Sequence, residues 1–127
     1  MDQDARRPIA HENGNAGAPT FDESVLIGLL DGDVQLAAEV LGDFERTLRQ
    51  SADEIEAAFR SQRPEDLVVA SHRLKASSRT VGAMRLGEMC ERLEEGASGP
   101  APSVQRMILA IMAEIGAVGR RLRATGR

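Results

Sequence analysis

Residues 64–82 read PEDLVVASHRLKASSRTVG and carry the start and stop signals of a single α-helix. Pro64 suits the first helical turn, where its missing N–H costs nothing. Glu65 and Asp66 place negative charge at the positive end of the helix dipole. Gly82 can adopt the left-handed conformation that ends many helices. The sequence therefore predicts one helix from Pro64 to about Val81.

Around the axis of this predicted helix the side chains separate into two faces. Each residue advances roughly 100°. The residues that share the side of His72 are Val68, Lys75, Ala76 and Arg79. The residues on the opposite side are apolar or small, and they are Leu67, Ala70, Leu74, Ser77, Ser78 and Val81. We expect the second set to pack inward and His72 to be exposed.

Two further helices are expected before this one. Asp22 can cap a short helix that ends near residues 31–32, and Asp33 can cap a long second helix. The apolar residues of the short helix are Val25, Leu26, Leu29 and Leu30. Those of the long helix recur at helical spacing and are Leu36, Val40, Leu41, Phe44, Leu48, Ile55 and Phe59.

Two more helices are expected after Gly82. The first covers about residues 83–97 and should bury Leu86, Met89, Cys90 and Leu93. The Gly- and Pro-rich residues 99–102 separate it from a last helix that begins at Ser103. The apolar stripe of that last helix is Val104, Ile108, Ile111, Ile115, Val118 and Leu122. This stripe is most simply core, although a second role as a dimer seam stays open.

These elements predict an all-α protein, an antiparallel four-helix bundle with a short additional N-terminal helix. No segment alternates with period two between turn signals, so no strand is expected. We assign residues 21–125 to the bundle domain. Residues 1–20 are rich in Asn, Gly, Pro and charge, which predicts a disordered N-terminal tail.

Composition limits the classes of function. Aromatic residues make up 2% of the 127 residues, so the core should be aliphatic. The net charge is −4, and with so few aromatic side chains for stacking on bases, nucleic acid is not an expected partner. Cys90 is the single cysteine, which excludes an internal disulfide and fits the cytoplasm. The longest apolar stretch, near residues 107–113, is short for a membrane span, and the first 20 residues do not resemble a signal peptide.

The surroundings of His72 suit phosphoryl chemistry. A neutral imidazole is a good nucleophile near pH 7, and a cation one turn away can pair with phosphoryl oxygens. Lys75 stands at that position and is the one lysine among 16 basic residues. Arg73 and Arg85 add positive charge nearby, and the small Ala76 would let a partner approach. We expect the partner-binding surface to consist of Val68, Arg73, Ala76, Arg79 and Arg85.

The run ASHRLKASSRTVGA at residues 70–83, followed by Leu86, Cys90, Leu93 and Glu94, closely resembles the signature of histidine-phosphotransfer (HPt) domains. That signature is roughly A-H-x-L-K-G-S, then G-A, then L, C and L-E. Tight similarity covers residues 70–94. The chain departs from it at Ala76, where the family usually has Gly, and at Ser71, where it usually has Ala. The methyl group of Ala76 could narrow the choice of partner.

The resemblance implies a phosphocarrier. His72 would be phosphorylated on Nε2, and Lys75 would contact the phosphoryl group. Partners would be receiver domains of response regulators or hybrid histidine kinases, which supply their own aspartate and hold the Mg²⁺. The chain would need no cofactor and would have no autokinase activity. We therefore expect a cytoplasmic, monomeric shuttle of a multistep phosphorelay, without identifying its kinase, its regulator or the direction of flow.

Three other functions fit the sequence less well. The dimerisation domain of a histidine kinase would need a following ATP-binding domain, and the sequence has no Gly-rich nucleotide loop. A helical adaptor that binds receivers without accepting phosphate would not need His72 and Lys75. A Ser or Cys hydrolase is disfavoured because no histidine lies near Cys90. With two histidines and one cysteine, no metal site is expected, and we assign no role to His11. Lys75 and Arg79 could also be ordinary solvated surface charges.

Overall fold

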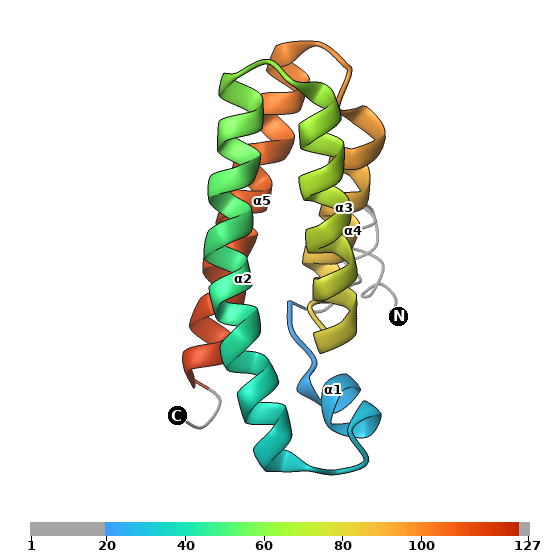
Figure 1. Ribbon diagram of the computed structural model, residues 1–127, viewed down its shortest axis with the longest axis vertical. Helices are drawn as coiled ribbons and strands as arrows, with labels where there is room; N and C mark the ends of the chain where they lie inside the picture. The colour runs from blue at the N-terminus through green and yellow to red at the C-terminus, as the bar shows by residue number, and fades with distance from the viewer. Residues whose placement is uncertain (1–19, 125–127) are drawn as a thin grey trace, which may run out of the picture.

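The computed structural model describes residues 20–124, and within them every element of regular secondary structure is an α-helix. The helices are α1 (Glu23–Leu29), α2 (Val34–Arg60), α3 (Pro64–Val81), α4 (Met84–Gly96) and α5 (Ala101–Ala124). Helices α2 to α5 run alternately up and down, and α1 lies under the end of α3 beside the start of α2 (Figure 1). This architecture confirms the predicted antiparallel four-helix bundle with a short additional helix. The predicted disordered tail lies outside the described residues except for Thr20.

The helix ends follow the sequence signals. The carboxylate of Asp33 accepts a hydrogen bond from the Leu36 N–H at 3.0 Å, and Asp22 caps α1 in the same way. Helix α3 begins at Pro64 and ends at Gly82, whose φ of 95° lies in the left-handed region. The Asp22 N–H donates to the Gly82 carbonyl oxygen at 2.9 Å, and a Cβ at Gly82 would overlap the Asp22 backbone. Gly82 therefore ends α3 and lets α1 dock against it.

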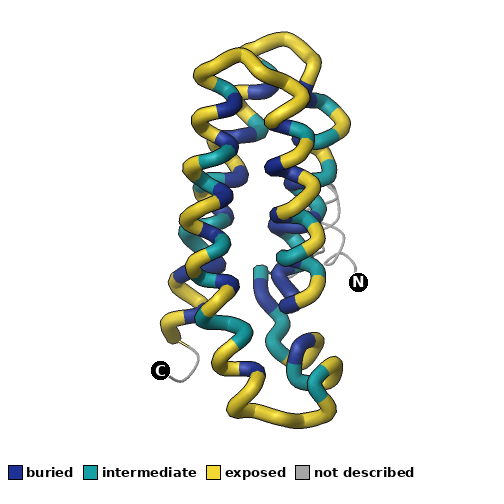
Figure 2. The backbone as a smooth tube through the Cα atoms, viewed as in Figure 1, coloured by how far each residue is buried: buried dark blue, intermediate teal, exposed yellow. Residues whose placement is uncertain are grey.

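The core is aliphatic, as the composition predicts. Buried positions face the bundle axis along each of the four long helices, and exposed positions face outward (Figure 2). The largest side chains with less than 2% exposure are Leu26, Ile55, Leu74, Leu86, Leu93, Ile111, Val118 and Leu122. Leu74 follows His72 by two residues, so the helix that carries the histidine is held by its opposite face.

Two predictions about element details were wrong, namely the start of the last helix and the burial of Met89, which is only half-buried. Helix α5 begins at Ala101, two residues before Ser103, because Pro102 fits within a first turn that needs no N–H from it. In α1 only Leu26 is buried, while Val25 and Leu29 remain 39% and 65% exposed. Leu36 is 40% exposed because the start of α2 lies at the end of the molecule, beyond the end of α3 (Figure 1).

Helix α5 is long and apolar enough, by length and composition, to cross a membrane. In the structure it packs between α2 and α4, and seven of its residues are buried there. The core helix of a water-soluble bundle has the same properties, so this feature is weak evidence for a membrane span.

Candidate functional site

His72 lies near the middle of α3, on the face that points away from the core. Its side chain is 61% exposed, whereas its neighbours Ser71 and Leu74 are fully buried. Because the buried residues fix the rotation of α3, His72 must project to solvent. This confirms the predicted orientation of the third helix. Ser77, predicted to face inward, is only half-buried.

The Glu94 carboxylate of α4 contacts both His72 and Lys75, the two residues predicted to take part in phosphoryl transfer. Its Oε2 lies 3.1 Å from His72 Nδ1, and its Oε1 lies 2.8 Å from Lys75 Nζ. A carboxylate only accepts hydrogen bonds, so the contact places the ring hydrogen on Nδ1 and the lone pair on Nε2. The exposed ring therefore offers Nε2 as its nucleophilic atom.

Lys75 is held close to the bundle surface, with 17% of its side chain exposed. Its hydrogen bond lowers the pKa of Glu94, and the contact from His72 acts in the same direction against the opposing effect of burial. Glu94 is therefore a carboxylate at neutral pH, bonded to a cation on one oxygen and to the imidazole on the other. The three side chains form one connected cluster across α3 and α4.

The other predicted basic residues are paired with carboxylates. Arg79 Nη2 donates to Glu91 Oε1 at 2.6 Å, and this bond lowers the pKa of Glu91. Arg73 Nη1 lies 3.6 Å from Glu54 on α2.

Arg85 Nη1 lies 3.9 Å from the buried Glu114 on α5. Arg85 thus faces α5, a helix that does not pack against α3. The structure does not bring it to His72, and the predicted basic patch is instead a set of ion pairs.

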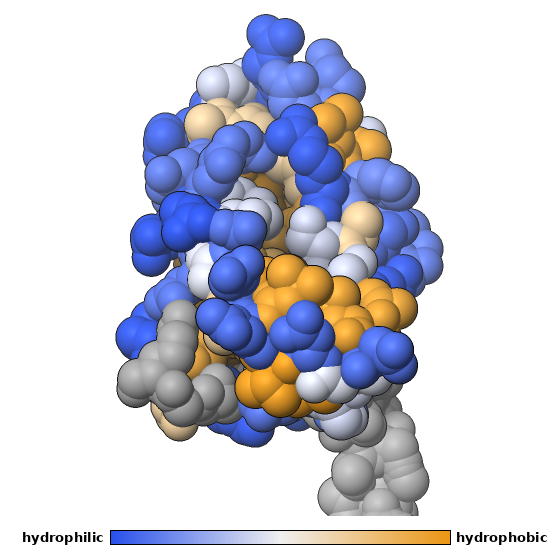
Figure 3. All heavy atoms as spheres, turned by 60° about the horizontal axis from the view of Figure 1, so that its bottom comes forward, coloured by the Kyte–Doolittle hydropathy of each residue, from blue (hydrophilic) through white to orange (hydrophobic). Residues whose placement is uncertain are grey.

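Small and apolar residues lie one turn to either side of the histidine on α3. Ala76 is exposed one turn after His72, and Val68 is half-buried one turn before it. Ala76 also opens a groove of about 320 Å³ between α2 and α3, lined by Val40, Asp43, Phe44, Thr47, Ala76, Ser77, Thr80 and Val81. At the end of the molecule that carries α1, apolar side chains gather on the surface (Figure 3). The exposed large apolar residues of α1 and the start of α2 are Val25, Leu29, Val34 and Leu36.

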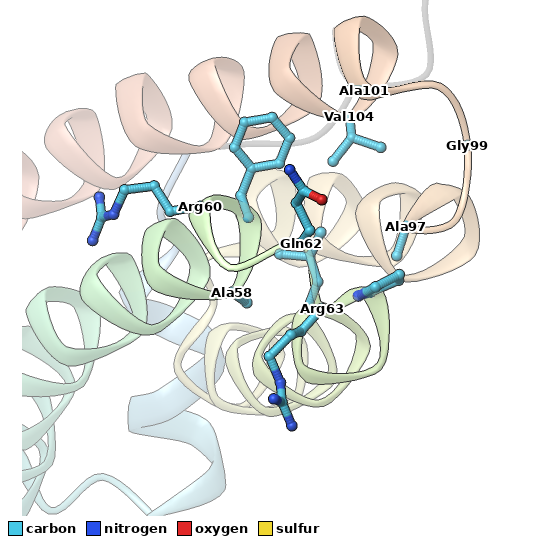
Figure 4. A pocket seen from close by; sticks show the side chains of 11 residues that line it. Ala58, Arg60, Gln62, Arg63, Ala97, Gly99, Ala101 and Val104 are labelled. Atoms are coloured by element: carbon cyan, nitrogen blue, oxygen red, sulfur yellow. The ribbon is translucent and has the colours of Figure 1, made fainter.

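A cavity of about 550 Å³ lies at the opposite end of the bundle, where α2 meets α3 and α4 meets α5. Ala58, Leu67, Ala97 and Val104 are among its lining residues, and no His, Cys, Asp or Glu lines it. The Arg60 and Arg63 guanidinium groups point away from it (Figure 4). It therefore lacks the groups for catalysis. Among the described residues no cluster of potential metal ligands occurs.

Comparisons with known proteins show the family to which the chain belongs. The family model of the Hpt domain matches residues 39–120. The chain belongs to the Hpt-domain family. The matched region contains His72, Lys75 and Glu94, so the whole cluster lies within the Hpt domain.

Two solved structures share the fold of this Hpt domain. The histidine-containing phosphotransfer protein B of Pseudomonas aeruginosa superposes with a TM-score of 0.73 at 24% identity, over 84% of this chain and 93% of that one. The HPT domain of a sensor hybrid histidine kinase from Shewanella gives 0.71 at 18% identity, over 82% and 91%. A comparison with curated protein sequences finds no match.

Sequence reasoning missed the role of Glu94. The residue was part of the motif that suggested the family, but it lies 22 positions after His72 on a different helix. Only the packing of α4 against α3 brings the carboxylate to the imidazole. The one available signal was that Glu94 follows the buried Leu93 and lies one turn after the buried Cys90, at the edge of the inward face of α4.

Proposed function

We propose that this Hpt domain accepts a phosphoryl group on His72 from the aspartyl phosphate of one receiver domain and passes it to the aspartate of another. The observation that carries the proposal is the exposed His72, with Nδ1 on Glu94 and Lys75 on the same carboxylate. Membership of the Hpt-domain family supports it.

The transfer step follows from the orientation of the ring. The Nε2 lone pair attacks phosphorus, the bond between phosphorus and the aspartyl oxygen breaks, and the aspartate leaves as a carboxylate. The hydrogen on Nδ1 stays in place, so the ring gains positive charge as the new bond forms. Glu94 stabilises that charge through its contact with Nδ1. The reverse sequence returns the phosphoryl group to a second receiver.

Lys75 supplies the positive charge for the phosphoryl oxygens. Before transfer its ammonium group is bound to Glu94 at 2.8 Å, one helical turn from His72. An ammonium group has three donors, so it can turn toward the phosphoryl group while keeping contact with Glu94. Phosphoryl transfer depends mainly on positioning and charge stabilisation, which these three side chains provide on an open helix surface.

The remaining parts of the reaction belong to the partner. We assign to the receiver domain the aspartate and the Mg²⁺, and to this chain the role of a phosphocarrier without autokinase activity. The docking surface is the apolar region from Val68 and Ala76 along the groove between α2 and α3 to the exposed residues of α1. A monomer in the cytoplasm fits this role.

The proposal is tested by incubating the protein with a phosphorylated receiver domain and following the label. Wild type and His11→Gln should gain acid-labile, base-stable label, and His72→Gln should gain none. His11 is the matched control because it is the only other histidine in the chain. If several receivers leave the folded wild type unlabelled, the chain is a binding adaptor and the proposal fails.

A further inference from the structure

Arg79 crosses from α3 to α4 through a gap left by a glycine. A Cβ atom at Gly87 would lie 2.9 Å from Arg79 Cγ and 3.3 Å from Nε, which is closer than side chains normally pack. Beyond Gly87 the guanidinium group reaches Glu91, where Nη2 donates to Oε1 at 2.6 Å. The side chain is therefore fixed at two points, although 40% of it is exposed.

The position of Arg79 places it within reach of a partner at the phosphorylation site. Seven residues separate it from His72, which is about two turns and about 10 Å along the same helix face. A standard protein interface covers about 800 Å² on each partner, which corresponds to a disc of about 16 Å radius. A receiver centred on His72 must therefore cover Arg79.

We propose that Arg79 is a preorganised anchor for an acidic side chain of the receiver, and that Gly87 and Glu91 are its positioning residues. This inference rests on the proposed function, because it assumes that the partner docks over His72. The guanidinium group has five donors in a planar fork, and within the described chain one nitrogen, Nη2, has an acceptor. The fork can therefore bind a second carboxylate from the partner.

Because the fold fixes Arg79 before a receiver binds, Arg79 can help to select one receiver over another. A long flexible side chain loses rotamer freedom when a partner immobilises it, and that loss weakens binding. Here the fold has already removed much of the freedom. A receiver with a carboxylate at the matching position gains the full contact, whereas a receiver without one must cover the guanidinium group with no partner for it. Arg79 thus discriminates between receivers without touching the phosphoryl group.

The test measures KM and kcat for transfer from a panel of phosphorylated receivers to four variants. Arg79→Gln should raise KM about tenfold for the preferred receiver, with a smaller effect on kcat. Gly87→Ala should raise KM about threefold although alanine favours the helix, because its methyl group displaces Arg79. Glu91→Gln should act in the same direction. The matched control is Arg121→Gln, the same change of charge on α5, and it should leave KM unchanged.

Two different failures can be told apart. If the wild type takes up no label from any receiver, the proposed function itself is wrong. If the wild type is labelled but Arg79→Gln and Arg121→Gln have the same KM for every receiver, the anchor is refuted and the phosphocarrier stands. A Gly87→Ala variant that is fully folded by circular dichroism and binds as tightly as wild type also overturns the positioning role of Gly87.

Discussion

Replacing Glu94 by glutamine tests two effects of the carboxylate, which stabilises the His72 ring and also holds the Lys75 ammonium group. The amide keeps the shape of the carboxylate but removes its charge. The hydrogen bond at His72 Nδ1, 3.1 Å long, then loses its anionic acceptor, and the positive charge that develops on the ring faces a neutral amide oxygen. Removing the charge from one partner of a hydrogen bond weakens it by about 1–1.5 kcal/mol, so the transition state loses about that much.

The same substitution releases Lys75, and this acts in the opposite direction. The ammonium group leaves a 2.8 Å ion pair in which both side chains are less than a quarter exposed. Such a pair stabilises by up to about 1 kcal/mol, and the amide oxygen still binds the ammonium group, so release contributes about 0.5 kcal/mol. The loss at His72 is larger, and the net cost of about 0.5–1 kcal/mol slows transfer about two- to fivefold.

A double-mutant cycle separates the two effects. In a Lys75→Met background there is no ammonium group to release, so Glu94→Gln should show the full loss of about 1–1.5 kcal/mol, a fall of about five- to tenfold. The assay is single-turnover transfer from a phosphorylated receiver, followed by quenching and counting of label. If Glu94→Gln is faster than wild type, or has no effect in the Lys75→Met background, Glu94 does not stabilise the charged ring.

Three further predictions concern the scaffold. Gly82→Ala should lower the free energy of unfolding by at least about 1–2 kcal/mol, because the left-handed φ is unfavourable for alanine and its methyl group would overlap the Asp22 carbonyl. An unchanged midpoint of urea unfolding would contradict this prediction. Burial raises the pKa of Glu114 despite Arg85, so the folded state loses stability as pH rises from the ordinary carboxyl value through the raised one. Glu114→Gln should therefore unfold at a higher temperature than wild type at pH 7.5 but not at pH 4, and a lower temperature at pH 7.5 would refute the assignment. Burial raises the pKa of Cys90 to about 12, so a thiolate-directed reagent at pH 8 should modify it only as fast as the protein unfolds; modification at the rate of a free thiol would show that it is accessible.

Much of the fold could be predicted because its signals are local. Asp33 caps α2, Pro64 begins α3 and Gly82 ends it, each through chemistry confined to one or two turns. The rotation of α3 was also predictable, since a buried Leu74 at helical spacing fixes the opposite direction of His72. Local rules say little about burial where an element is short or lies at the end of the bundle, and Leu29 of α1 is apolar but exposed.

The chemistry of the site could be predicted only in part. His72 and Lys75 are one turn apart on one helix, so their proximity follows from helix geometry. The partners of the charged residues come from other helices, and a sequence does not show which carboxylate each cation meets. Glu94 from α4 and Glu54 from α2 change the predicted basic patch into ion pairs. In the proposed transfer, the phosphoryl group therefore meets a lysine that already has a partner.

We infer that Glu94 holds the hydrogen of His72 on Nδ1 and leaves Nε2 to carry the phosphoryl group. The most direct test is nuclear magnetic resonance of the phosphorylated protein with ¹⁵N-labelled histidine, which shows by phosphorus–nitrogen coupling which ring nitrogen is bonded to phosphorus. We expect coupling to Nε2 of His72 and a hydrogen retained on Nδ1. Phosphorus bonded to Nδ1, or to His11, would contradict it.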